Sequence, residues 1–165
     1  MKKIFYWSPY LSNVATIKNV LNSSLSLKKY SSNYDVSIIE VIGEWSNLEK
    51  ILAKNEIGIK KINKLSLKLP KVGFMTSRIY SIMIFFLSFF SLKDLLKKQN
   101  PDYLIIHLLT SLPLFLLVFF KFDTKFVLRI SGLPKLNFFR KLLWKLASDK
   151  LHMITCPSSQ TVDDL

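Results

Sequence analysis

Short apolar runs alternate with helical patterns along this chain, and the alternation constrains the fold more than any other feature. The runs cover residues 4–7, 35–41, 103–107, 125–130 and 152–155, with a further possible strand at 59–62. Such runs are typical of strands in a parallel sheet, because helices cover both faces of the sheet. The sequence therefore predicts an α/β fold, a doubly wound parallel sheet of the Rossmann-like type.

The helical patterns fall between the expected strands, at residues 14–30, 47–54, 76–98, 111–120 and around 139–146. A last helix opens at residues 160–165, so the chain ends inside it. A length of 165 residues accommodates one core, so we expect a single domain over 1–165.

Two stretches are apolar enough to suggest a membrane. Residues 79–90 are shorter than the roughly 20 residues that cross a bilayer, which favours a helix in the core or one leaning on a bilayer. Residues 104–120 are interrupted by His107, Thr110 and Pro113, which favours a strand followed by a helix. A small integral membrane protein remains an alternative.

The chain is strongly basic, with 24 Lys and Arg against 11 Asp and Glu and a net charge of +13. Such a surface attracts phosphate-rich partners. No helix-turn-helix, RRM or zinc-finger frame is present, so we expect an anionic membrane surface and no nucleic acid. The residues expected to contact it are Lys64, Lys68, Lys71, Arg140, Lys141, Trp144 and Lys145. In the helix around 139–146, Phe139, Leu142, Leu143 and Leu146 form one face, and the basic residues with Trp144 form the other.

Several kinds of site are absent from the sequence. The single cysteine, Cys156, allows no internal disulfide and no CxxC metal site. There is no HExxH motif, no glycine-rich phosphate loop and no pair of carboxylates at a spacing typical of hydrolases. We therefore expect no metal and no cofactor.

Ligands of doubly wound sheets bind at the carboxyl ends of the strands, which selects the candidate residues. His107 and Arg129 end two apolar strands, and Ser131 and Gly132 follow the second of them. After the first strand, Ser12, Asn13 and the helix amides behind them are the possible anion or hydroxyl contacts. For both His107 and Arg129 a purely structural role remains open.

Four segments resemble the GT-B fold, family 4 glycosyltransferases of bacterial surface-polysaccharide and lipopolysaccharide synthesis. They are KIFYWSPYLSNVAT (3–16), PDYLIIH (101–107), LRISGLP (128–134) and TCPSS (155–159). The resemblance implies retaining, metal-independent transfer of a sugar, of hexosyl type, from a nucleotide-diphosphate donor to a lipid-linked or saccharide acceptor. It further implies that the chain is the amino-terminal acceptor-side domain, with His107 as its catalytic strand-end histidine.

The nucleotide-sugar-binding domain of that family would lie beyond residue 165, and it would be supplied in cis or in trans. The fragment alone is then expected to be inactive. The resemblance also implies a cytoplasmic, peripheral position at the inner face of the bacterial membrane. A truncated, catalytically inactive remnant or a partner subunit with the same fold remains the main alternative.

Overall fold

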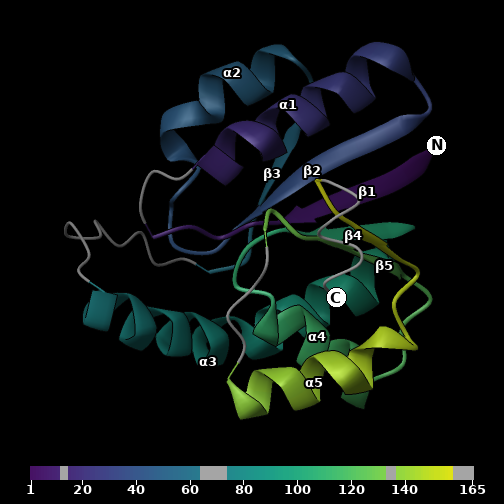
Figure 1. Cartoon of the computed structure of the whole chain (residues 1–165). Helices are drawn as coiled ribbons and strands as arrows, with labels where there is room; N and C mark the ends of the chain where they lie inside the picture. The colour runs from purple at the N-terminus through teal and green to yellow at the C-terminus, as the bar shows by residue number, and fades with distance from the viewer. Residues whose placement is uncertain (12–14, 64–73, 133–136, 158–165) are drawn as a thin grey trace.

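Six parallel strands form one sheet in the order β3-β2-β1-β4-β5-β6, with helices on both faces (Figure 1). The computed structural model describes residues 1–11, 15–63, 74–132 and 137–157, without the side chains of 74–76. The strands are β1 Lys2–Trp7, β2 Tyr34–Glu40, β3 Gly58–Lys61, β4 Tyr103–Ile106, β5 Lys125–Arg129 and β6 Met153–Thr155. The helices are α1 Ala15–Tyr30, η1 Ser46–Leu48, α2 Glu49–Lys54, α3 Phe74–Gln99, α4 Ser111–Phe119 and α5 Phe138–Ser148.

The predicted doubly wound sheet is confirmed, and each expected strand is present within two residues of its predicted ends. β1 lies at the centre, pairing with β2 on one side and β4 on the other. Its last residue, Trp7, pairs with Ile39 and Ile106. Because all pairs are parallel, the carboxyl ends of the strands gather at one edge.

Two apolar layers cover the two faces of the sheet. On β1, Ile4 and Tyr6 pack with α1 and α2, whereas Phe5 and Trp7 pack with α3, α4 and α5. The alternation follows from the period of two in a strand. The helices α1 and α2 lie above the sheet and α3, α4 and α5 below it in Figure 1.

The long apolar helix α3 lies along the sheet. Its segment Ser77–Gln99 is long and apolar enough to cross a membrane by length and composition, and 22% of its apolar window is buried. One side of it, formed by Ile84, Leu92 and Leu96, is fully buried in the core under the sheet. The stretch 104–120 divides into β4 and α4, which confirms the two-element interpretation.

The helix α5 presents its two sides differently from what the sequence suggests. Ala147 is buried and Trp144 is half-buried, facing the core. Of the predicted apolar face, Phe139, Leu142 and Leu146 are 77%, 47% and 48% exposed, whereas Leu143 is half-buried and packs against the core. Most of the apolar face of α5 therefore points away from the core.

Candidate functional site

A cavity of about 200 Å³ lies at the carboxyl ends of β4 and β5, next to α5. It is lined by His107, Leu108, Leu109, Thr110, Leu128, Arg129, Ile130, Ser131, Gly132, Arg140 and Trp144. This is the edge of the sheet at which open α/β folds bind ligands.

Two larger hollows, of about 680 and 580 Å³, lie elsewhere. One is lined by the carboxyl-terminal end of α3 and the segment that leads into β5, and the other by the carboxyl-terminal ends of α1 and α2. Both lie where helices lead back to the amino ends of the strands, away from the ligand-binding edge. We therefore assign the candidate site to the smaller cavity.

His107, which directly follows β4, lines this cavity. Its backbone N–H donates to the carbonyl of Trp7 at 3.0 Å, which extends the pairing of β1 and β4 by one residue. The side chain is 5% exposed, and neither ring nitrogen has a hydrogen-bond partner among the described residues. Burial, with a smaller contribution from the positive charge of Arg129, lowers the pKa of His107 to about 4. The imidazole is therefore neutral at physiological pH.

Further polar groups lie in the cavity without a partner. The Thr110 hydroxyl, the Arg140 Nε and the Trp144 Nε1 are buried and make no hydrogen bond within the described part of the chain. Buried polar groups are nearly always hydrogen-bonded, because an unpaired donor loses its hydration without replacement. With the exposed guanidinium of Arg129 beside them, these donors suit an anionic or hydroxyl-bearing ligand.

The loop between β4 and α4 contains a strained backbone. Leu109 has φ of 47°, the left-handed region that residues with a Cβ rarely adopt. Its carbonyl accepts a hydrogen bond from the Trp7 indole at 3.2 Å. Such backbone conformations persist where neighbouring contacts enforce them, often beside functional groups. The bond holds the segment that directly follows His107.

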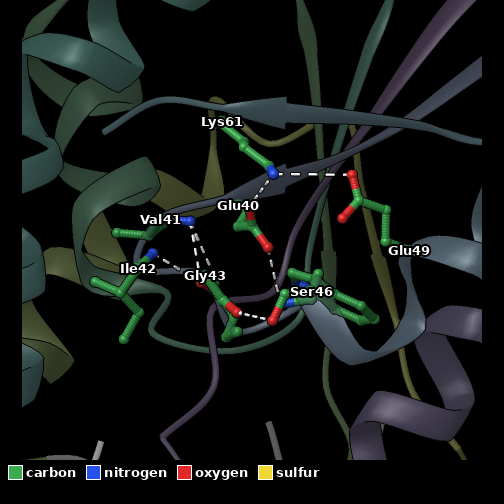
Figure 2. Close-up of polar contacts among 9 residues, drawn as sticks. Glu40, Val41, Ile42, Gly43, Ser46, Glu49 and Lys61 are labelled. Carbon is green, nitrogen blue, oxygen red and sulfur yellow. Dashed lines mark hydrogen bonds and ion pairs between the residues drawn. The ribbon is translucent and has the colours of Figure 1, made fainter. Parts of the chain in front are cut away.

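A second polar cluster lies at the carboxyl end of β2 (Figure 2). The Glu40 carboxylate accepts from the Trp45 backbone N–H at 3.1 Å and lies 3.8 Å from Lys61. Gly43 has φ of 87°, which favours glycine, and its carbonyl accepts from the Ser46 hydroxyl at 2.8 Å. These contacts fix the turn between β2 and η1.

The side chain of Glu44 stabilises the same turn through hydrogen bonds to its backbone. Its carboxylate accepts from the backbone N–H of Ile42 at 2.8 Å and of Val41 at 3.1 Å. Burial nevertheless raises the pKa of Glu44 to about 7, with a small contribution from Glu40. The hydroxyl of Tyr10 donates to the Glu44 carbonyl. The carboxyl groups of Glu40 and Glu44 are thus engaged with the protein itself.

The structure brings together four of the residues predicted to act in the site: His107, Arg129, Ser131 and Gly132. Arg140 and Trp144, expected to contact a membrane, line this cavity as well, and their contact with a membrane stays a prediction. Lys141 and Lys145 are exposed on α5, as that expectation requires. Ser12, Asn13, Lys64, Lys68 and Lys71 lie outside the described residues.

Sequence reasoning missed Thr110 and the inward orientation of Arg140 and Trp144. A spacing of four residues places Arg140 and Trp144 on one face of a helix, so the sequence predicts that they lie close together. The sequence does not predict which face of the helix turns towards the core. No group of three or more His, Cys, Asp or Glu residues that could hold a metal occurs within the described ranges. The absence of a metal and a cofactor stays a prediction.

Comparison with solved structures identifies the fold. A UDP-N-acetylglucosamine 2-epimerase matches with a TM-score of 0.58 and 14% identity, over 98% of this chain and 43% of that protein. A putative UDP-N-acetylglucosamine 2-epimerase from Listeria monocytogenes matches with a TM-score of 0.62 and 13% identity, over 99% of this chain and 41% of that protein. The UDP-GlcNAc 2-epimerase from Neisseria meningitidis bound to UDP-GlcNAc matches with a TM-score of 0.60 and 15% identity, over 99% of this chain and 42% of that protein.

The chain thus has a Rossmann-type α/β fold that matches part of these UDP-N-acetylglucosamine 2-epimerases, and it spans less than half of their length. No protein-family model matches the chain, and no curated protein matches it in sequence. At these identities the likeness concerns the fold.

Proposed function

We propose that this chain is the amino-terminal, acceptor-side half of a glycosyltransferase that takes a sugar from a nucleotide-diphosphate donor. The observation that carries the proposal is the cavity at the carboxyl edge, lined by Arg129, Arg140 and a neutral His107 whose ring nitrogens have no hydrogen-bond partner among the described residues. The solved neighbours with the same fold act on UDP-GlcNAc, which supports a nucleotide-sugar substrate. The acceptor is a hydroxyl of a lipid-linked or growing saccharide.

The chemistry assigned to the cavity follows from its charges. A neutral imidazole carries one N–H donor and one acceptor nitrogen, so His107 can orient a sugar hydroxyl. Glycosyl transfer leaves negative charge on the departing diphosphate, and fixed donors stabilise such charge where water is excluded. Arg129, Arg140 and the Trp144 indole supply positive charge and N–H donors beside His107.

Transfer fits the cavity better than epimerisation. Inversion of a sugar carbon next to the anomeric centre requires groups that remove and return a proton at that carbon. Glu40 and Glu44, carboxylates near the carboxyl end of β2, accept backbone N–H groups of their own turn. A histidine with a pKa of about 4 is a weak base. The N–H donors that line the cavity suit a departing diphosphate better than they suit removal of a proton.

The test uses the longest open reading frame that contains this chain, with UDP-GlcNAc as the probe donor. Acceptor-dependent release of UDP, lowered about a hundredfold or more in His107→Ala with unchanged thermal stability, supports the proposal. An equal fall of activity and stability assigns His107 a structural role. Conversion of UDP-GlcNAc to its C2 epimer without an acceptor makes the proposal wrong.

The inactive alternative is tested with the same assay. The 165-residue chain is assayed alone and together with the rest of the reading frame expressed as a separate chain. Turnover only in the mixture assigns the chain the role of a half-enzyme complemented in trans. If the complete reading frame turns over none of a panel of nucleotide sugars and saccharide acceptors, the inactive remnant is the correct interpretation.

A further inference from the structure

One face of the molecule exposes an unusual number of large apolar side chains. Among the described side chains, nine of them lie on α3, α4 and α5: Ile79, Ile82, Phe86, Phe90, Phe119, Phe138, Phe139, Leu142 and Leu146, each at least 47% exposed. On the opposite face, α1 and α2 expose two, Tyr30 and Ile51. Soluble monomers rarely expose contiguous apolar patches of this kind unless the patch binds something.

The apolar residues of α3 form a continuous stripe. Ile79, Ile82, Phe86 and Phe90 recur at spacings of three and four, so they share one helix face. The side formed by Ile84, Leu92 and Leu96 is packed in the core at 1% exposure or less. The helix is therefore fixed along the sheet, and its apolar stripe is turned to the outside.

Aromatic contacts join this stripe to α4. Phe86 contacts Phe85 with ring centroids 5.5 Å apart, Phe85 contacts Phe115 at 5.7 Å, and Phe115 contacts the exposed Phe119 at 4.4 Å. The helix α5 packs on α4 on the same side of the sheet and carries the other four exposed residues (Figure 1). The three helices form one apolar face, which we call the α3–α5 face.

The positive charge of the α3–α5 face indicates which kind of partner it binds. Its helices contain four basic residues on α3 and two exposed lysines on α5, Lys141 and Lys145, against one acidic residue, Asp94, which pairs with Lys98 at 3.7 Å. A second copy of the chain would bring the same positive charge against it. An apolar surface among lysines is instead complementary to the interface of an anionic bilayer, where apolar groups enter the acyl boundary and lysines meet the headgroups.

We propose that the α3–α5 face docks the protein on an anionic lipid bilayer, with α3 and α5 lying in the plane of the interface. Phe86 and Phe90 from α3 and Phe139 and Leu142 from α5 enter the bilayer. Lys141 and Lys145, exposed on α5, contact the headgroups. This docking differs from a membrane span, because leaving the sheet would expose the buried side of α3. It does not depend on the reaction proposed above.

The experiment measures cosedimentation of the purified chain with vesicles of phosphatidylcholine mixed with phosphatidylglycerol, and with pure phosphatidylcholine, at low and high salt. We expect binding to the mixed vesicles that weakens with salt. Phe86→Asp with Phe90→Asp should lower the partition coefficient about a hundredfold, because two largely exposed phenylalanines no longer enter the bilayer.

The matched control is Tyr30→Asp with Ile51→Asp on the α1–α2 side, which should leave vesicle binding close to that of the unmodified chain apart from a small effect of charge. The pair Lys141→Gln and Lys145→Gln should lower binding to the mixed vesicles about thirtyfold and leave binding to pure phosphatidylcholine unchanged. All six side chains are exposed, so the variants should fold, which circular dichroism checks.

Three results would overturn the proposal. The first is no binding to the mixed vesicles at low salt. The second is an equal loss of binding in the two aspartate pairs, which would reflect the added charge alone. The third is a chain that does not bind vesicles but self-associates through Phe86 and Phe90 in sedimentation experiments, since the face would then be a protein interface.

Discussion

The indole of Trp7 donates a hydrogen bond of 3.2 Å to the carbonyl of Leu109, the residue that takes a left-handed backbone two positions after His107. Trp7 ends the central strand β1, and Leu109 belongs to the loop that lines the candidate cavity. The bond links the rigid centre of the sheet to the segment that follows the site histidine.

This bond should be measurable in the free energy of unfolding. Trp7→Phe leaves the Leu109 carbonyl without its donor, which costs about 1–3 kcal/mol beyond the loss of packing. Trp45→Phe is the matched control, because Trp45 is equally buried and its Nε1 has no partner among the described residues. Urea denaturation should show the larger loss in Trp7→Phe. Equal losses would mean that the indole–carbonyl bond contributes nothing.

The pKa of His107 provides a direct test of the cavity. An NMR titration of its ring protons, assigned with His107→Gln, should give a pKa of about 4. Arg129→Gln should raise this pKa, but only part of the way to 6.5, because burial is the larger cause. Lys141→Gln, which removes an exposed charge of α5, is the comparison. A wild-type pKa near the ordinary value would contradict the buried position of the ring.

Glu44 should make stability depend on pH in the direction opposite to most acids. Its pKa is about 7 in the folded protein against an ordinary value of 4.5, so the folded state binds more protons between these values. The contribution of Glu44 to the free energy of unfolding is fully present below pH 4.5 and is lost as the pH rises to about 7. The free energy of unfolding falls in this window by up to about 1.4 kcal/mol per pH unit. Glu44→Gln should gain stability relative to wild type across this window, as measured by denaturation at several pH values.

His107 supplies the control for that experiment, since its shift has the other sign. Its pKa is about 4 in the folded protein against 6.5 ordinarily, so the unfolded chain binds more protons between these values. The contribution of His107 to the free energy of unfolding is fully present above pH 6.5 and is lost as the pH falls towards 4. The curves of Glu44→Gln and His107→Gln relative to wild type should therefore have opposite slopes where the windows overlap. Parallel slopes would exclude these assignments.

Binding of inorganic pyrophosphate should separate two neighbouring cations of α5. Arg140 lines the cavity, and Lys141 is exposed on the outer side. Arg140→Ala should weaken binding by about tenfold or more, since a charge-assisted hydrogen bond is lost, whereas Lys141→Ala should change it little. Chemical-shift titration of His107 provides the measurement. A similar effect of both variants would indicate attraction by net charge alone.

Local patterns predicted most of the fold. The apolar runs ending at Trp7, His107 and Thr155 located strands to within two residues, because a strand buried on both faces has few alternatives to a continuous apolar sequence. The strand-end rule then selected His107 and Arg129 without knowledge of the tertiary structure, because parallel strands share one carboxyl edge.

Which way α5 faces could not be predicted in the same manner. Its sequence offers an apolar side with Phe139 and Leu142 and a mixed side with Arg140 and Trp144, and amphipathicity alone turns the apolar side inward. In the structure Trp144 and Arg140 line the cavity that His107 also lines, and most of the apolar side, including Phe139 and Leu142, is exposed.

The sequence by itself determined the alternation of strands and helices, their parallel arrangement and the edge at which a ligand would bind, because these depend on local periodicity. Only the tertiary structure decided that Arg140 and Trp144 line the same cavity as His107, and that Phe86, Phe119 and Phe139 are exposed on the same side of the sheet. The physical reason is that the rotation of a helix about its own axis is set by the elements packed around it. The favoured rotation is the one that buries the most apolar area in total and leaves the fewest buried polar groups unpaired.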